Sequence, residues 1–132
     1  MQKRIGAFII RDKKLLLVSG NGSEIYWSPG GRIEKGETPE QCLTRELDEE
    51  IGVKVKSARL YMHQTAEPRM FNNKQLPEID NYYYLVETEG EIKPSNEIDS
   101  YLWIGKNDIN SPHLRDFYKE IIIPKLVKEK LM

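Results

Sequence analysis

The segment that most constrains this chain is residues 31–53, because it places three glutamates on one side of an expected short helix. Glu46, Glu49 and Glu50 are spaced i, i+3 and i+4, so their side chains share a helix face and repel one another there. They also lie near the expected C-terminus of the helix, where the helix dipole disfavours anions. A divalent cation that gathers the three carboxylates would explain this arrangement, which indicates chemistry on phosphates.

The sequence also predicts where this helix begins and ends. Residues 38–41 have the pattern of a capping box with Thr38 at the N-cap and Pro39 at the first helical position. Gly52 is suited to the left-handed residue that ends a helix. An apolar stripe spaced by four residues should attach the helix to a core, and its members are Leu43, Leu47 and Ile51.

Strands are expected on both sides of this helix. Apolar runs at residues 5–10 and 15–18 precede it, with the polar residues 11–14 between them suited to a hairpin or tight connection. After the helix, residues 53–64 read as one bent strand or two, residues 65–78 as a polar loop, and residues 81–87 and 101–104 as strands. With a second helix at the end of the chain, this order predicts an α/β fold whose mixed β-sheet is sandwiched between helices.

The second helix is expected to open at Ser111 and Pro112. Its buried face would carry Leu114, Phe117 and Ile121. Pro124 should break or kink it, and the lysine-rich residues 125–132 should fray.

Composition limits the class of protein. The 132 residues are enough for one domain and short for two, so a single domain over residues 1–132 is predicted. The 20 Lys+Arg and 21 Asp+Glu give a formal net charge of -1, so no global field favours nucleic acid or an anionic membrane. One cysteine, Cys42, cannot form an internal disulfide. Without a run near the ~20 apolar residues that span a bilayer, a soluble cytoplasmic protein is expected.

The spacing around the three glutamates is that of a known sequence box. Five residues separate Gly31 from Glu37, and seven separate Glu37 from the run Arg45-Glu46-Leu47-Asp48-Glu49-Glu50-Ile51-Gly52-Val53. This pattern resembles the complete box of the Nudix hydrolase family, and residues 27–31 resemble the approach to that box in MutT-type members. The resemblance implies a loop–helix–loop that holds Mg²⁺, with Mn²⁺ as an alternative, on the diphosphate of a nucleotide derivative. Water would then attack phosphorus.

The resemblance also implies roles for single residues. Glu49 and Glu50 match the principal metal ligands, and Glu46 matches a third ligand that deprotonates the water in some members. The carbonyl of Gly30 or Gly31 could complete the metal sphere, because a glycine lets the backbone approach an ion closely.

Three further residues near the box are candidates for supporting roles. Arg45 would fix the carboxylates by a bidentate contact with the box, and a weak surface ion pair with Glu37 is the alternative. Cys42 is expected to be a small residue that leaves room for metal and substrate, since its sulfur is poorly matched to Mg²⁺.

Several MutT-type members also use a carboxylate from a loop well after the box. Glu97 is the candidate for this catalytic role in this chain, and Asp99 is the alternative. Either could instead be a loop acid that faces water.

The substrate depends on residues outside the box. A base needs an aromatic face and a polar edge. The stacking candidates are Tyr26, Trp27, Phe71 and Tyr83, and the polar candidates are Asn81 and Arg69. His63 is expected to be packed or exposed rather than a base, and Pro68 lies at a spacing that resembles ADP-ribose-cleaving members.

The sequence therefore predicts a Mg²⁺-dependent pyrophosphohydrolase that converts a nucleoside triphosphate to the monophosphate and pyrophosphate. Two alternatives stay open. One is a hydrolase of ADP-ribose, a nucleotide sugar, a dinucleoside polyphosphate or an isoprenoid diphosphate, and the other is a non-catalytic nucleotide-sensing module. The expected partner is a small nucleotide, with no stable nucleic-acid complex and no membrane, and a homodimer is possible.

Overall fold

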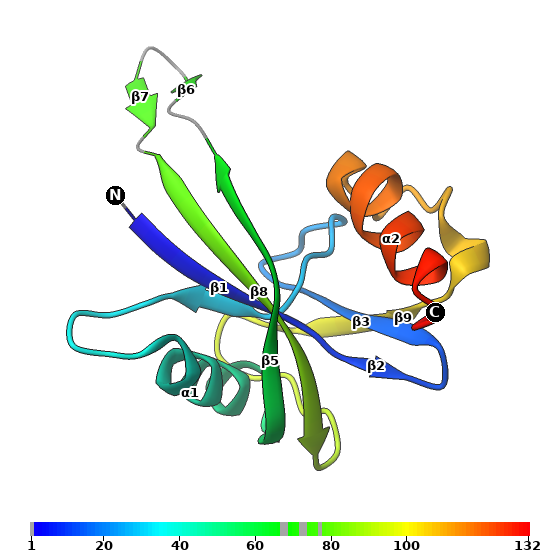
Figure 1. The fold of residues 1–132 in the computed structure, drawn as a ribbon, viewed down its shortest axis with the longest axis horizontal. Coiled ribbons are helices and arrows are strands. Elements are labelled where there is room, and N and C mark those ends of the chain that lie inside the picture. The colour runs from blue at the N-terminus through cyan, green and yellow to red at the C-terminus, as the bar shows by residue number, and fades with distance from the viewer. Residues whose placement is uncertain (1, 67–68, 72–73, 77) are drawn as a thin grey trace.

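The computed structural model describes the backbone of residues 2–66, 69–71, 74–76 and 78–132 and the side chains of residues 2–65 and 78–132 (Figure 1). Its largest sheet has the strand order β4-β1-β8-β5. β1 pairs with β8 in parallel, whereas the β1–β4 and β5–β8 pairs are antiparallel, so the sheet is mixed. The strands span Gln2–Phe8 (β1), Gly30–Arg32 (β4), Lys54–Ala66 (β5) and Ile79–Glu89 (β8).

A second sheet, a hairpin and four helical elements complete the described part of the molecule. The sheet is antiparallel, in the order β2-β3-β9, and a separate hairpin pairs β6 with β7. These strands span Ile10–Arg11 (β2), Lys14–Ser19 (β3), Arg69–Phe71 (β6), Lys74–Leu76 (β7) and Ser100–Ile104 (β9). The helices span Pro39–Ile51 (α1), Lys106–Asp108 (η1, a 3₁₀-helix), Phe117–Ile122 (η2, a π-helix) and Ile123–Lys128 (α2).

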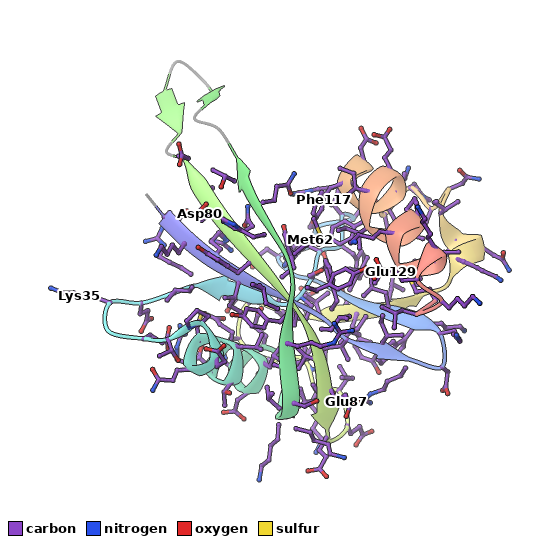
Figure 2. All side chains as sticks on the ribbon, in the orientation of Figure 1. Lys35, Met62, Asp80, Glu87, Phe117 and Glu129 are labelled. Carbon is purple, nitrogen blue, oxygen red and sulfur yellow. The ribbon has the colours of Figure 1, made fainter. Side chains whose placement is uncertain are left out.

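Helix α1 covers one face of the strands, and η2 with α2 covers the opposite face, as Figure 1 shows. Alternation along β1 and β3 sends Ile5, Ala7, Leu16 and Val18 into one core with α1. Phe8, Leu15 and Leu17, on the other face of these strands, enter a second core with η2 and α2. Met62 of β5 and Phe117 of η2 both pack against that second core (Figure 2). The predicted α/β architecture, a mixed sheet between helices, is confirmed.

The ends of α1 follow the local sequence. Thr38 Oγ1 accepts a hydrogen bond from Gln41 N at 3.1 Å, and Gln41 Oε1 accepts one from Thr38 N at 2.9 Å. Gly52 ends the helix with φ 67° and donates to the carbonyl of Asp48. The stripe of Leu43, Leu47 and Ile51 is fully buried. Each of these predictions is confirmed.

The structure corrects the expectation for residues 65–78. Residues 54–64 lie in one strand, β5, with register shifts at Val55/Ser57 and Leu60/Met62, and that strand continues to Ala66. The following segment contains β6 and β7 rather than only a loop. Pairing between backbones needs no apolar side chains, so a polar sequence gave no signal of this hairpin.

The C-terminal segment also differs from expectation. The helical turns begin near Phe117 rather than at Ser111, and they continue through Pro124 without a break. The wide π-turn lies directly before this proline, whose ring crowds the carbonyl four residues earlier in an ordinary α-helix. The buried positions are consequently Leu114, Tyr118 and Ile122, while Ile121 is 44% exposed.

The residues expected to fray are packed. Leu126 is fully buried and Met132 is 7% exposed, both in the second core. Among the described residues, no helix has the length and apolar composition that crossing a bilayer requires.

Replacing Leu126 by alanine tests this packing. Because the side chain is fully buried, Leu126→Ala should lower the free energy of unfolding by about 2–5 kcal/mol. The control is Ile121→Ala, a truncation at an exposed position of the same segment, which should change it by less than about 1 kcal/mol. Urea unfolding measures both, and equal small effects would mean that the segment is frayed.

Candidate metal and substrate site

Three carboxylates from two separate segments converge beside α1. Oxygen atoms of Glu46, Glu50 and Glu97 lie within 4.8 Å of one another. Glu49 is not in this group, because its side chain is 49% exposed and turns toward the guanidinium of Arg45. The structure thus brings together two of the three box glutamates with the predicted loop carboxylate Glu97, whereas the side chain of Asp99 stays outside the group.

Glu50 is the buried member of this cluster. It is 2% exposed, and its Oε1 accepts a hydrogen bond from the backbone N–H of Gly30 at 3.2 Å. Gly30 has φ 152°, and a Cβ there would overlap the carbonyl of Ile5. Only glycine lets the start of β4 approach β1 closely enough to place this N–H on the carboxylate.

Glu97 reaches the cluster because its loop is attached to the C-terminus of α1. The carbonyl of Glu49 accepts hydrogen bonds from Ser95 Oγ at 2.5 Å and from Asn96 Nδ2 at 2.8 Å. The carbonyls of Glu50 and Ile51 accept from the N–H groups of Ser95 and Lys93. These are the carbonyls that a helix leaves without internal partners. The loop therefore satisfies the helix end and fixes the residue that follows Asn96.

Two glycines make room for the carboxylates. A Cβ on Gly31 would lie 2.5 Å from Glu46 Oε1, and one on Gly20 would overlap the backbone carbonyl of Glu97. Neither glycine has a positive φ, so space rather than backbone conformation requires them.

Arg45 ties the loop before α1 to the cluster. Its Nε and one terminal nitrogen donate to the two oxygens of Glu37 at 2.8 and 3.0 Å, which is a bidentate contact. Its other terminal nitrogen lies 2.9 Å from Glu46 Oε1 and 3.5 Å from Glu49 Oε2. With the arginine 26% exposed and Glu37 14% exposed, this pair is partly buried, unlike a weak surface ion pair.

The electrostatics of the site differ between its two ends. The Arg45 guanidinium, with the N–H of Glu34, lowers the pKa of Glu37 to about 2. Burial, together with the charges of Glu46 and Glu97, raises the pKa of Glu50 to about 8. Burial also raises the pKa of Glu46, although Arg45 opposes this shift.

The donor set fits a hard divalent cation. Carboxylate oxygens are the ligands that Mg²⁺ and Mn²⁺ prefer, and a small number of them is usual because waters and substrate phosphates complete the sphere. Glu50 contacts no cationic side chain within ion-pair distance in the described part of the chain. A bound cation would offset the burial of the charged carboxylate and the repulsion from Glu46 and Glu97, which together raise its pKa.

A pocket of about 560 Å³ adjoins the cluster through Gly30. Trp27, Asn81 and Tyr83 line it, so the structure brings together three of the predicted substrate residues. Phe117 lies across from Tyr83 with ring centroids 5.5 Å apart, and Tyr118 donates its hydroxyl to Ser28 Oγ at 2.9 Å. The pocket therefore has aromatic walls and a polar amide.

Sequence reasoning missed two arginines in this pocket, Arg4 of β1 and Arg115 before η2. Arg4 precedes an apolar run and Arg115 lies in a polar stretch, so neither carried a local pattern. For Arg4, the parallel pairing with Asn81 was the missing information.

The other candidates lie elsewhere. Tyr26 is outside the pocket, with its hydroxyl 3.1 Å from Ser100 Oγ and its ring against His113. His63, whose side chain is 43% exposed, contacts Asp80 at 2.9 Å and stacks on Tyr82. Pro68 and the side chains of Arg69 and Phe71 are outside the described residues.

Cys42 is a buried thiol beside the box. It donates to the carbonyl of Arg32 at 3.3 Å, and burial raises its pKa to about 12. A thiol in this state is a poor nucleophile and a poor ligand, as its expected role as a small packing residue requires.

The raised pKa of Glu50 predicts a pH dependence of stability. An acid whose pKa is about 8 when folded and about 4.3 when unfolded binds more protons in the folded state between these values. Without metal, its contribution to the free energy of unfolding should therefore fall as the pH rises through this window. In Glu50→Gln that fall should shrink, and at pH 8 the variant should be more stable than the wild type by about 1 kcal/mol or more.

Urea unfolding in chelator at pH 5 and pH 8 measures this difference. Glu49→Gln removes an exposed acid from the same turn and is the matched control. A Glu50→Gln variant that keeps the wild-type pH dependence would show that ionisation of Glu50 does not lower the free energy of unfolding.

Comparison with known proteins bears on the family of the chain. The profile of the NUDIX domain matches residues 1–125. The 8-oxo-dGTP diphosphatase of Haemophilus influenzae is 61% identical over 33 residues, 25% of this chain and 24% of that protein. The NAD-capped RNA hydrolase NudC of Photobacterium profundum is 35% identical over 81 residues, 60% of this chain and 27% of that protein. The chain thus spans about a quarter of the length of these curated relatives.

The fold is shared with solved structures. A MutT protein from Bacillus halodurans superposes with a TM-score of 0.78 at 22% identity, covering 94% of this chain and 80% of that one. Because the profile covers nearly the whole chain, family membership predicted from the box is confirmed. This chain belongs to the NUDIX domain family.

Proposed function

We propose that this protein is a divalent-metal-dependent pyrophosphohydrolase. Its substrate class would be a nucleoside diphosphate derivative, with a nucleoside triphosphate cleaved to the monophosphate and pyrophosphate as the preferred member. The observation that carries the proposal is the convergence of Glu46, Glu50 and Glu97 within 4.8 Å. Mg²⁺ is the proposed ion, with Mn²⁺ as a substitute.

In this proposal each residue has a distinct task. Glu46, Glu50 and Glu97 hold the ion. Glu49, at the exposed edge of the cluster, is a further ligand in this proposal. When bound, the cation lowers the pKa of a water and neutralises charge on the leaving diphosphate. Glu46, whose pKa is raised by burial, accepts the proton of the attacking water.

Arg45 would keep Glu46 in place for this task. It is anchored on Glu37 by two hydrogen bonds, so its remaining terminal nitrogen is directed at Glu46 Oε1 at 2.9 Å. We therefore assign Arg45 a positioning role, and the backbone of Gly30 a role in orienting Glu50.

The adjoining pocket supports a nucleotide rather than a simple diphosphate. A base could stack between the aromatic walls made by Tyr83, Phe117 and Trp27, while Asn81 reads its edge. Arg4 and Arg115 add positive charge on the same pocket, which favours the phosphates of the substrate. The relative named 8-oxo-dGTP diphosphatase supports a nucleoside triphosphate as the preferred member.

A turnover screen tests the substrate class. Canonical and oxidised nucleoside triphosphates, ADP-ribose, nucleotide sugars and dinucleoside polyphosphates are offered with Mg²⁺ or Mn²⁺, and the released nucleoside monophosphate and pyrophosphate are measured. We expect the highest kcat/KM with a nucleoside triphosphate. Turnover of only the other compounds would assign a different hydrolase on the same scaffold, and nucleotide binding with no turnover would indicate a sensing module.

Substitutions that replace a carboxylate by an uncharged amide test the cluster. Glu50→Gln and Glu97→Gln should each lower kcat by at least about 100-fold, because each removes a ligand that stabilises charge in the transition state. The control is Asp48→Asn, which removes an exposed acid from the same helix and should retain activity. Full activity of Glu50→Gln in steady-state assays would refute the metal site.

Asn81→Ala tests the pocket. Loss of a hydrogen bond to the base should raise KM about tenfold with a smaller change in kcat, since the amide lies away from the reacting phosphorus. Asn110→Ala, at an exposed position outside the pocket, should leave both constants unchanged. Unchanged KM in Asn81→Ala would remove Asn81 from the proposed base contacts.

A further inference from the structure

The loop that leads into β4 is held by the C-terminal part of the chain. The N–H of Tyr26 donates to the carbonyl of His113 at 3.0 Å, and Nδ1 of His113 lies 2.6 Å from the carbonyl of Glu24. Further along the loop, Ser28 makes two hydrogen bonds with Tyr118 of η2, which is 90 positions away in the sequence. Residues 113–118 therefore fix the path of residues 24–28.

The hydroxyl of Tyr118 forms the buried part of this contact. It accepts a hydrogen bond from the N–H of Ser28 at 2.9 Å and donates one to Ser28 Oγ at 2.9 Å. Tyr118 is 5% exposed and Ser28 is 9% exposed. Burial raises the pKa of Tyr118, so the hydroxyl keeps its proton and serves as donor and acceptor at once. A buried backbone N–H needs such a partner.

The residues that follow Ser28 carry the donor that orients Glu50. The carbonyl of Pro29 accepts a hydrogen bond from the N–H of Ala7 in β1 at 2.8 Å. The N–H of Gly30 then lies 3.2 Å from one carboxylate oxygen of Glu50 and 3.4 Å from the other. The ring of Pro29 fixes its φ, so the direction of the Gly30 N–H depends on where Ser28 is held.

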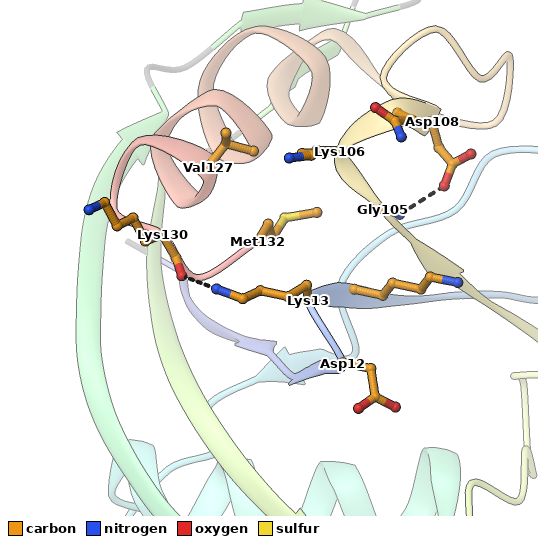
Figure 3. Close-up of a pocket in the computed structure, with 10 residues that line it drawn as sticks. Asp12, Lys13, Gly105, Lys106, Asp108, Val127, Lys130 and Met132 are labelled. Carbon is orange, nitrogen blue, oxygen red and sulfur yellow. Dashed lines mark hydrogen bonds between the residues drawn. The ribbon is translucent and has the colours of Figure 1, made fainter.

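Tyr118 lies on a firmly packed support. η2 leads directly into α2, and the fully buried side chains of Ile122 and Leu126 attach both elements to the second core. At the other end of α2, Lys13 Nζ in the β2–β3 turn donates to the carbonyl of Lys130 at 2.7 Å (Figure 3). The C-terminal segment is thus fixed at points that do not involve the loop before β4, as a positioning group requires.

The π-helix gives two consecutive residues different contacts. Phe117 lines the pocket beside the carboxylate cluster, against Tyr83, whereas Tyr118 reaches Ser28. The wide turn shifts the buried face of the segment onto Tyr118. Such turns are costly irregularities that are frequent at functional sites, and this one brings a hydroxyl to the loop that orients Glu50.

We propose that Tyr118 is a positioning residue for the carboxylate cluster of Glu46, Glu50 and Glu97. Its hydroxyl holds Ser28 so that the Gly30 N–H stays on Glu50, and this contact keeps the Glu50 carboxylate directed at the cation. Tyr118 itself does not touch the ion. This inference rests on the proposed metal-dependent function and adds a residue from the C-terminal segment to it.

A Mn²⁺ titration of the metal-free protein without nucleotide, followed by electron paramagnetic resonance, tests the proposal. Tyr118→Phe keeps the ring and removes both hydrogen bonds. It should weaken the Mn²⁺ affinity by about tenfold, the lower end of the effect of losing a group that orients a metal ligand. Tyr61→Phe is the matched control, because its hydroxyl, in the same core, donates to Glu129 at 2.6 Å outside the pocket. It should leave the affinity unchanged.

Two further variants guard against effects on folding. Ser28→Ala removes one of the two hydrogen bonds and no ring atom, so it gives the same test if Tyr118→Phe does not fold. It should weaken the Mn²⁺ affinity by a smaller factor, and an unchanged affinity would overturn the proposal. Leu126→Ala destabilises the second core at a position that does not line the pocket, and in its folded state it should keep the wild-type affinity.

The amide resonance of Gly30 reports the contact directly. In ¹H–¹⁵N NMR spectra of the metal-free protein, this resonance should shift in Tyr118→Phe and should keep its position in Tyr61→Phe and Leu126→Ala. A loss of stability alone would not move it. An unmoved Gly30 resonance in Tyr118→Phe would overturn the positioning role.

Glu50→Gln separates this inference from the proposed function. If Glu50→Gln leaves the Mn²⁺ affinity unchanged, the cation binds elsewhere, and both the metal site and the role of Tyr118 are refuted. If Glu50→Gln weakens binding while Tyr118→Phe behaves like Tyr61→Phe, the metal site stands and only the positioning role is overturned. An equal loss of affinity in Leu126→Ala and Tyr118→Phe would overturn it too, because general loss of packing would then explain the effect.

Discussion

The site depends on the hydrogen bonds that join the C-terminal carbonyls of α1 to the loop from Lys93 to Asn96. A helix end needs such partners, and this one receives them from a segment more than forty residues later in the sequence. The same contacts place Glu97 beside Glu46 and Glu50. The contacts that satisfy the end of α1 therefore also assemble the carboxylate cluster.

Charge within the cluster is balanced unevenly. Arg45 and Glu37 form a strong pair that holds Glu46, whereas Glu50 is buried with a backbone N–H as its nearest donor. The pKa of Glu50 rises to about 8 for this reason. Ligands of like charge repel one another in the empty site. A bound cation offsets this repulsion, which favours its binding.

The local sequence accounted well for α1. Its capping box, its proline, its apolar stripe and its terminal glycine act within a few residues of one another, so the pattern and the structure agree. The C-terminal segment was harder, because the π-turn before Pro124 shifts the buried face by one residue from Phe117 and Ile121 to Tyr118 and Ile122. Periodicity assumes a uniform helix, and this segment is not uniform.

The sequence by itself determined the family box, the helix that carries it and the identity of most acidic candidates. Tertiary structure decided that Glu97 completes the cluster while Glu49 stays at its rim, and that Arg4 and Arg115 join Asn81 in one pocket. Helical spacing places side chains on a face, but it does not say which of them the neighbouring strands and loops will bury. That choice depends on contacts between distant segments, which only the folded chain makes.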